Sequence, residues 1–536
     1  MTPPSFHDSS PSSSASFAIH SDSRATLKHI ADTLMGEDEE DKNRILQNCF
    51  ALEAAEKPFY EAIGQKYPYA CFRRQTDCSS GSSDDDDAYI SPNRRIHFRD
   101  EEYDVEEERC NKQKATELTE CDSLTEMFDA VVLPPSEKTP FSKETNPKTS
   151  RGRKHGNKVE VVDLLSMLTR CAEAVAKEEH RTANAMLKQI KQHSSIEGDV
   201  NQRLSLYFSN ALEARLLGIK PPPYEHHPRN MRMMQVLKSY QVYLKACPFH
   251  KISFIFANRT ILKLAENAKK LHIIDFGIMY GFQWPSLIQR LSERNGGPPM
   301  LKITGIDLPQ AGLRPEHKVK ETLRMLKRYC ERFKVEFESH VISKKWETIE
   351  YTDLNLEGEE MTVVNSMYRM KNIGDDTVEP RSPRDRVLNL INKIRPNLLI
   401  MGVVNGAYNA PFFATRFREA LFFFWTMFDI LEGTVGRESE ERMVLEREVL
   451  GRDIMNSIAC EGTERVDRPD TYKQWQSRIM RACFKQVPLD HELVGTVKER
   501  VSFEYNRDYV VDQDAQWLLL GWKGRITKAI SLWKPL

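Results

Sequence analysis

Two aspartates and two glycines in the middle of the chain have the types and spacing of a nucleotide-binding turn. Asp275 ends an apolar run, Gly277 and Gly281 follow it, and Asp307 ends the next apolar run. In nucleotide-binding α/β folds the glycines let the backbone approach the cofactor, and an acidic residue at the end of the second strand binds the ribose hydroxyls. The best enzymatic interpretation of this pattern is an S-adenosylmethionine-dependent methyltransferase.

The residues around that turn argue against catalysis. Met279 stands at the middle of the turn, where a bulky side chain would fill the space that a cofactor needs. The segment 365–368, Asn-Ser-Met-Tyr, lacks the paired prolines that amino-group methyltransferases place before the aromatic residue. We find no nucleophilic triad and no Walker sequence. We therefore expect no catalytic residues and no cofactor, and the two aspartates and two glycines are candidates for a vestigial pocket.

A parallel sheet must hold these residues in place. After residue 271, apolar strand-like runs alternate with helix-like runs, which is typical of an α/β fold with helices on both faces of the sheet. The expected strands are 271–276, 301–307, 335–341, 361–365 and 397–404. The expected helices between them include 284–292, 318–333 and 384–394. The pattern predicts a doubly wound core in which Asp275 and Asp307 lie at the ends of adjacent strands.

A helical region precedes this core. Apolar side chains recur at helical spacing after Asp163, Ala183 and Leu204. These stripes are too short and too interrupted for an extended coiled coil, so we expect them to form core. Four well-separated tryptophans predict a packed C-terminal end of the domain: Trp475, Trp517, Trp522 and Trp533.

Residues 1–157 differ in composition from the rest of the chain. Their Ser-rich, Pro-rich and charged tracts bury too little apolar surface to offset the entropy of ordering, so we expect this region to be mostly disordered. The stretch 30–68 combines an acidic run with a short helical stripe, which Pro58 interrupts. Such a short acidic-hydrophobic motif suits a partner-binding helix. The candidate activation residues are Leu52, Phe59 and Tyr60.

A basic cluster lies at the end of this N-terminal region. It contains Arg151, Arg153 and Lys154 beside glycines, in a stretch expected to be flexible. Nuclear import receptors recognise short clusters of this kind. The cluster is therefore the candidate nuclear localisation signal.

Charge, hydropathy and cysteine spacing narrow the functional classes. The net charge of −1 gives no general attraction to nucleic acid or to anionic membranes, so a DNA contact must come from a local patch or a partner. No apolar run is long enough to span a bilayer, and no secretory signal is recognisable. The ten cysteines include no CxxC pair. We expect reduced thiols, no metal site and no membrane contact.

Ordered motifs over residues 160–536 resemble those of the GRAS (SCARECROW-like) family of plant transcription regulators. The segment 271–285 is similar to the VHIID block of that family, with Leu271 in place of the usual Val. The other blocks follow in order, with the first leucine-rich region at 161–165 and 181–184, the second after 305–309, PFYRE at 405–413 and SAW at 465–475. One departure is the terminal tripeptide, Ser531-Leu532-Trp533 in place of Ser-Ala-Trp. The N-terminal stretch resembles the lily SCARECROW-like subgroup.

The resemblance implies a domain organisation and a fold. It implies a GRAS domain over residues 158–536, with a methyltransferase-like (Rossmann-type) core under an α-helical cap. The first leucine-rich region would supply most of that cap. Residues 158–256 would then form mainly the cap and residues 257–536 mainly the α/β core, after the disordered N-terminal region.

The resemblance also implies a nuclear regulator, with an activator motif near the N-terminus. Family members commonly reach DNA through bound transcription factors, such as zinc-finger or TGA-type bZIP proteins. Other GRAS proteins are further expected partners, in homo- or heterodimers. The near-zero net charge favours recruitment, because phosphate neutralisation needs clustered Lys and Arg. Direct sequence-specific DNA binding stays open as an alternative, and an S-adenosylmethionine-dependent methyltransferase as a second one.

Overall fold

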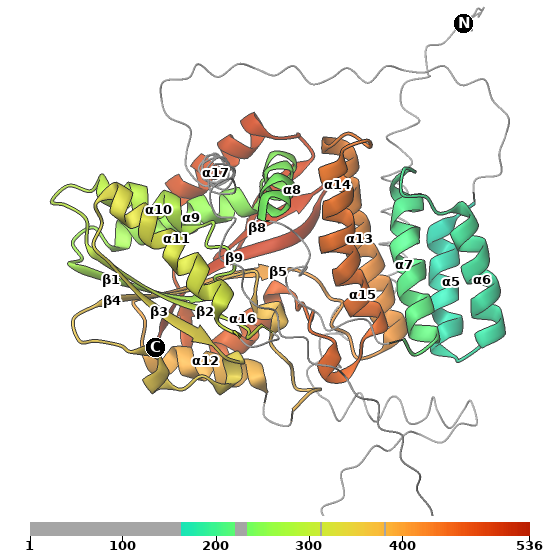
Figure 1. Cartoon of the computed structure of the whole chain (residues 1–536), viewed down its shortest axis with the longest axis horizontal. Coiled ribbons are helices and arrows are strands. Elements are labelled where there is room, and N and C mark those ends of the chain that lie inside the picture. The colour runs from blue at the N-terminus through green and yellow to red at the C-terminus, as the bar shows by residue number, and fades with distance from the viewer. Residues whose placement is uncertain (1–161, 220–232, 311–313, 380–381) are drawn as a thin grey trace, which may run out of the picture. The chain divides into compact units, whose positions relative to one another are not determined.

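The computed structural model describes residues 162–219, 233–310, 314–379 and 382–536, which Figure 1 draws in colour. The predictions for residues 1–157 lie outside these described residues. They concern the stretch 30–68, the activation candidates Leu52, Phe59 and Tyr60, and the basic cluster of Arg151, Arg153 and Lys154.

A nine-stranded mixed sheet forms the centre of the described chain (Figure 1). Its strands are β1 (Lys270–Phe276), β2 (Met300–Asp307), β3 (Phe337–Ser343), β4 (Met361–Met367), β5 (Leu398–Val404), β6 (Phe484–Gln486), β7 (Tyr509–Asp514), β8 (Trp517–Trp522) and β9 (Arg525–Pro535). Their order is β3-β2-β1-β4-β5-β9-β8-β7, and β6 pairs with β9. The first five strands are parallel and β9 is antiparallel to β5. This order confirms the expected Rossmann-type, methyltransferase-like core.

The central strands agree well with the predicted ones, because strands buried on both faces are mostly apolar. β1 is buried from Leu271 to Phe276, and β5 is buried throughout. The weakest match is β3, predicted at 335–341 but starting two residues later. It is an edge strand with several exposed positions, so its apolar signal is faint. Asp275 pairs with Gly305, and Asp307 is the last residue of β2, so the prediction of adjacent strand ends is confirmed.

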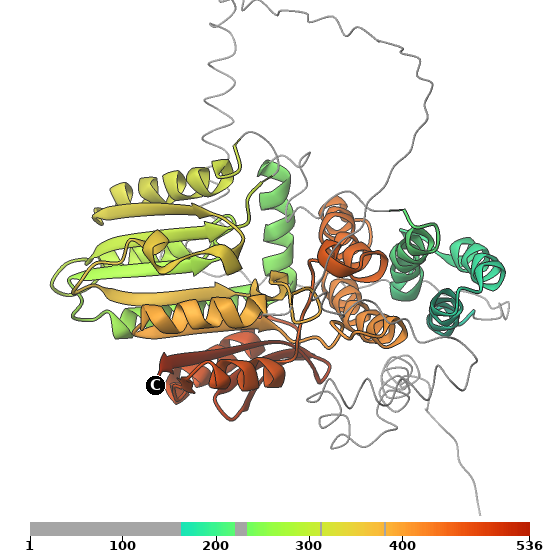
Figure 2. The ribbon, with the colours of Figure 1, turned by 90° about the horizontal axis from the view of Figure 1, so that it is seen from below.

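Helices flank the sheet on both sides (Figure 2). They are α8 (Met233–Ala246), α9 (Phe249–Leu264), α10 (Trp284–Ser292), α11 (His317–Phe333), α12 (Pro383–Ile394), α16 (Tyr472–Arg481) and α17 (His491–Glu504). α10 has the predicted bounds, and Pro285 in its first turn suits a helix start because its N–H would be unpaired there anyway. α11 ends where Lys334 adopts a left-handed conformation with φ of 55°.

A helical layer packs beside the sheet (Figures 1 and 2). It contains α5 (Leu164–Ala176), α6 (His180–His193), α7 (Val200–Leu216), α13 (Phe413–Thr434), α14 (Glu440–Leu445) and α15 (Arg452–Ala459). α7 contacts α13 and α15, and these contacts join the helices α5–α7 to the helices α13–α15. The local sequence pattern did not predict that 413–459 belongs to this layer. α13 is buried at nearly every position from Phe423 to Leu431, so no single apolar stripe indicates its partner.

Buried ion pairs hold the two halves of the helical layer together. Arg203 of α7 contacts Glu432 of α13 at 2.8 Å and Glu446, just after α14, at 3.2 Å. Arg442 of α14 contacts the same two carboxylates, at 2.8 and 3.0 Å. Because a buried charge is stable only when it is paired, these four side chains fix how α7 meets α13 and α14.

The C-terminal end of the chain is tightly packed. Trp475, Trp517, Trp522 and Trp533 are each at most 2% exposed, which confirms the predicted packed end. Trp517 and Trp533 meet edge to face with ring centroids 6.2 Å apart. Trp522 donates from Nε1 to Asp429 of α13 at 2.7 Å, so the last strands are also fixed to the helical layer.

Candidate functional site: a pocket at the carboxyl ends of the strands

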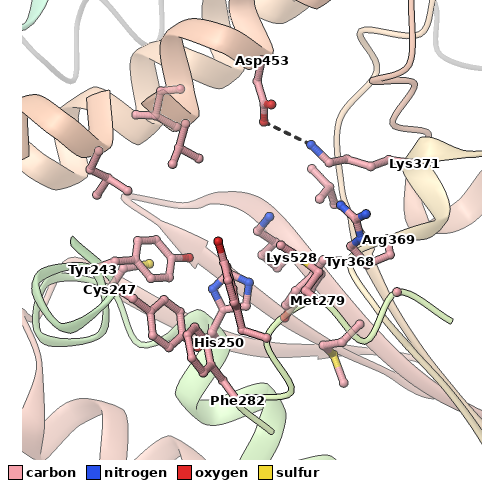
Figure 3. A pocket seen from close by; sticks show the side chains of 18 of the residues that line it. Tyr243, Cys247, His250, Met279, Phe282, Tyr368, Arg369, Lys371, Asp453 and Lys528 are labelled. Atoms are coloured by element: carbon pink, nitrogen blue, oxygen red, sulfur yellow. Dashed lines mark hydrogen bonds and ion pairs between the residues drawn. The ribbon is translucent and has the colours of Figure 1, made fainter. Parts of the chain in front are cut away.

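A cavity of about 340 Å³ lies where the carboxyl ends of β1, β4 and β5 meet the helices (Figure 3). Open α/β sheets bind their ligands at this edge. Its walls come from α8, α9, the turn after β1, the segment after β4, β9 and the helices α13 and α15. Asp275, Gly277, Met279 and Gly281 all line it. Asp307 is not among the lining residues, but its carboxylate contacts Arg369, which lines the cavity, so the structure brings the predicted site residues together.

Asp275 is held by neutral donors. Its carboxylate accepts from Trp284 Nε1 at 2.8 Å and from Asn365 Nδ2 at 2.9 Å. Burial raises the pKa of Asp275 to about 7, and the two hydrogen bonds only partly offset it. Gln283 exchanges hydrogen bonds with Asn365 and with Asn258 of α9. Asp275 therefore anchors an amide network that joins β1, β4, α9 and α10.

Arg369 fills the place at which the nucleotide pattern puts a cofactor. Its Nη2 lies 3.3 Å from Asp307 Oδ1, and both side chains are nearly fully buried. A Cβ added at Gly277 would meet Arg369 Cγ at 2.5 Å. The freedom of Gly277, at φ of +97°, is thus used for the close approach of Arg369, and Asp307 is already neutralised by an arginine.

The second glycine of the turn faces a helix. A Cβ at Gly281 would meet Thr322 Cγ2 of α11 at 3.0 Å, and Gly281 has a φ of +65°. Thr322 also donates its hydroxyl to the Met279 carbonyl at 2.7 Å. α11 therefore fixes the turn, and Met279 adopts a left-handed φ of 50° within it. That Met279 occupies cofactor space stays a prediction.

The segment 365–368 serves packing as well as lining the pocket. Asn365 holds Asp275, and Ser366 donates to the Phe276 carbonyl at 3.2 Å. The Tyr368 hydroxyl hydrogen-bonds Ser253 of α9, and its backbone has a φ of 65°. Burial raises the pKa of Tyr368, so this phenol is neutral at physiological pH.

Two lysines inside the pocket were missed by the sequence analysis. Lys371 contacts Asp467 at 2.6 Å and Asp453 of α15 at 3.2 Å, and Figure 3 shows the second of these pairs. Lys528 of β9 lies 4.7 Å from the centre of the Tyr368 ring and is 8% exposed. Burial, aided by the charge of Lys371, lowers the pKa of Lys528 to about 8.

The groups beside Lys528 are mostly uncharged. Burial, with a contribution from Lys528, lowers the pKa of His250 to about 3, so its imidazole is neutral. Burial raises the pKa of the Cys247 thiol to about 11. Tyr240 stacks on Phe282 with centroids 4.3 Å apart, and its pKa is also raised by burial. The pocket therefore combines aromatic and apolar walls with a few cations at its base.

The described stretches contain neither a cluster of metal ligands nor a membrane-spanning helix. Within the four described stretches, no group of three or more His, Cys, Asp or Glu side chains is placed to hold a metal ion. No helix among those residues has the length and hydropathy needed to cross a membrane. The five cysteines described, Cys171, Cys247, Cys330, Cys460 and Cys483, are all free thiols.

A partial signal for the missed residues was present in the sequence. Arg369 and Lys371 follow the predicted strand 361–365 within a few residues, near the sheet edge where ligands bind. Lys528 carried no such signal. It lies opposite Val404 at the end of β5 only because β9 inserts antiparallel beside β5.

Comparisons with known proteins identify the family. The GRAS domain family model matches residues 164–534. The chain is 47% identical over 465 residues to Scarecrow-like protein 14 of Arabidopsis thaliana, covering 82% of this chain and 60% of that protein. It is 43% identical to Scarecrow-like protein 11 of the same plant, covering 99% of this chain and 92% of that protein.

A solved structure agrees with these matches. The crystal structure of SCL7 from Oryza sativa superposes with a TM-score of 0.59 at 27% sequence identity, covering 70% of this chain and all of that one. Family model, relatives and structure all match the described region. The chain therefore belongs to the GRAS domain family of Scarecrow-like plant transcription regulators.

Proposed function

We propose that this protein acts in the nucleus as a transcriptional co-activator, without catalysis of its own. DNA-binding partners, such as zinc-finger or TGA-type bZIP proteins, recruit it to promoters. Its folded domain docks these partners, alone or as a dimer with another GRAS protein. Its N-terminal region recruits the transcription machinery.

The observation that carries the non-catalytic part is the contact between Arg369 and Asp307. A nucleotide cofactor would need the Asp307 carboxylate for its ribose, and the arginine holds that carboxylate at 3.3 Å. The arginine side chain also packs against Gly277, where a cofactor would approach the backbone. Calorimetry of the full chain with S-adenosylmethionine should show no tight binding. Clear binding would revive the methyltransferase alternative.

The activator part rests on the N-terminal composition. The stretch 30–68 combines acidic residues with Leu52, Phe59 and Tyr60, a mixture that suits the apolar grooves of co-activator proteins. Residues 1–157 fused to a neutral DNA-binding domain should therefore drive a reporter gene. Phe59→Ala with Tyr60→Ala should weaken the reporter.

A matched control tests whether any loss of aromatic side chains has this effect. Tyr89→Ala with Phe98→Ala removes the same two residue types outside the stretch 30–68 and should leave the reporter unchanged. A silent wild-type fusion, or equal loss from both pairs, would remove the activator claim.

Nuclear entry is assigned to the basic cluster. Arg151, Arg153 and Lys154 together supply the charge that import receptors recognise. Their triple alanine variant, fused to a fluorescent reporter, should accumulate less in the nucleus. Normal localisation would place the signal elsewhere or on a partner.

One feature favours the alternative of direct DNA binding. The outer face of α11 exposes Lys320, Arg324, Lys327, Arg328 and Arg332, against the two exposed acids Glu321 and Glu331. Clustered cations on one helix can neutralise DNA phosphates. Lys320 and Arg324 are partly engaged by Glu316 and Glu321 at the surface, which weakens the patch but does not remove it.

A gel-shift assay separates recruitment from direct binding. Under recruitment, the purified protein shifts promoter DNA only when a bZIP partner is present, and Lys327→Glu with Arg328→Glu changes nothing. Under direct binding, the protein shifts DNA alone and this double variant loses the shift. Lys473→Glu with Lys498→Glu, two exposed lysines on α16 and α17, is the matched charge control.

A further inference from the structure

Lys528 is a buried cation that faces a cavity. It is 8% exposed, it lines the pocket, and it lies on β9 opposite the last residue of β5. Figure 3 shows it between His250 and Tyr368 on one side and the Lys371–Asp453 pair on the other. No hydrogen bond or ion pair joins its ammonium to another side chain in the described parts of the chain; its recorded contact is the Tyr368 ring at 4.7 Å.

The neighbouring carboxylates are already engaged. Asp453 and Asp467 both contact Lys371, at 3.2 and 2.6 Å. These two carboxylates raise the pKa of Lys528 only through longer-range electrostatic attraction, and the positive charge of Lys371 lowers it. His250 and Cys247 are neutral and supply no counter-charge. A buried ammonium is stabilised most by a carboxylate or other anion in direct contact, and Lys528 has no such direct partner in the described chain, so it can pair with an anion that enters the cavity.

The remainder of the pocket suits an apolar body. Its volume of about 340 Å³ lies within the range of small-molecule sites. Stacked Tyr240 and Phe282 form one side. The helical layer forms another side with Met427, Ile430, Leu431 and Val449. Val449 is 44% exposed, which marks a place where the pocket reaches solvent.

We propose that this pocket binds a small molecule with an apolar, ring-bearing body and one anionic group, and that the anionic group pairs with Lys528. The apolar body lies between the Tyr240 side and the helical layer. Because the pocket is lined by both the sheet edge and α13–α15, such a ligand contacts both layers of the domain. This inference goes beyond the proposed co-activator function and does not depend on it.

A pair of fluorescent probes tests the proposal. 8-Anilinonaphthalene-1-sulfonate has an apolar ring body and one sulfonate, and N-phenyl-1-naphthylamine has the same rings without the charge. The full-length protein should bind the anionic probe at one saturable site. Lys528→Met should weaken that binding at least about tenfold, because one partner of a desolvated charge pair is lost. Binding of the neutral probe should be unchanged.

Three further variants complete the test. Lys528→Arg keeps the charge and should retain the anionic probe, whereas Val449→Trp at the opening should weaken both probes. Lys498→Met removes an exposed lysine of α17 and should affect neither. Circular dichroism verifies that each variant is folded. The proposal is overturned if wild-type protein binds neither probe at a saturable site, or if Lys528→Met binds the anionic probe as tightly as wild type.

Discussion

Arg369 and Lys528 are both buried cations beside the same cavity, but of the two only Arg369 forms an ion pair with a carboxylate in the described parts of the chain. Arg369 lies 3.3 Å from Asp307 and packs against Gly277. Lys528 has an aromatic ring and neutral groups around it, and its nearest carboxylates are bound by Lys371. At the end of the pocket next to the glycine turn, Arg369 pairs with Asp307 and lies against Gly277. The end next to β9 is left open to an external anion.

The largest expected effect concerns the third cation, Lys371. Lys371→Met leaves Asp453 and Asp467 without their shared counter-ion inside the protein, and should lower the free energy of unfolding by about 3–5 kcal/mol. Lys528→Met is the matched control, because it removes a buried lysine that has no carboxylate to leave behind. We expect no loss of stability there, measured by urea denaturation with tryptophan fluorescence. Equal losses of stability from both variants would show that Lys528, like Lys371, is paired with a carboxylate.

The second largest loss of stability is expected for the ion pair between Arg369 and Asp307. Arg369→Ala strands the Asp307 carboxylate and should cost about 3 kcal/mol of unfolding free energy. Arg324→Ala removes an arginine from an exposed pair with Glu321 and should cost less than about 1 kcal/mol. Thermal denaturation of the two variants gives the comparison. A loss from Arg369→Ala as small as the control's would mean that this buried ion pair contributes no more to stability than an exposed one.

The glycine turn should respond more weakly. Gly277→Ala adds a Cβ that meets Arg369 Cγ at 2.5 Å, at a φ of +97°, and should cost about 1–3 kcal/mol. Gly296→Ala has a similar φ of +86° with nothing within 4 Å, so it carries the backbone strain alone. The difference between the two measured free energies isolates the contact with Arg369, and a difference of zero would contradict it.

The smallest expected effect is the change of stability with pH that is caused by Lys528. Its pKa falls to about 8 in the folded protein from 10.5, so between these values the unfolded chain binds more protons. Stability contributed by this group therefore rises with pH, by about 1 kcal/mol between pH 7 and pH 9. The pKa of Lys528 also depends on four charged or titratable neighbours: Lys371, Asp453, Asp467 and Cys247. The rise is measured as the difference between wild type and Lys528→Met, and a flat difference would place the lysine in contact with water.

The sequence alone determined where β1 ends and which residues form the turn that follows it. The mostly apolar run before Asp275, and the proline at the start of α10, located β1, the turn and the helix to the residue or nearly so. The ordered motifs pointed to the family that the comparisons then showed. The local pattern was sufficient here because buried strands are marked by runs of apolar residues, and the start of this helix is marked by a proline in its first turn.

Only the tertiary structure decided what those residues face. The pattern left Gly277 and Asp307 as candidates for a vestigial cofactor pocket, whereas the fold puts Arg369 against both. The helices α13, α14 and α15 belong to the helical layer. The family resemblance had implied that residues 257–536, which include these helices, form mainly the α/β core. Lys528 reaches the pocket because β9 pairs antiparallel with β5, more than a hundred residues away in sequence. Such placements depend on long-range pairing, which no local spacing of residues records.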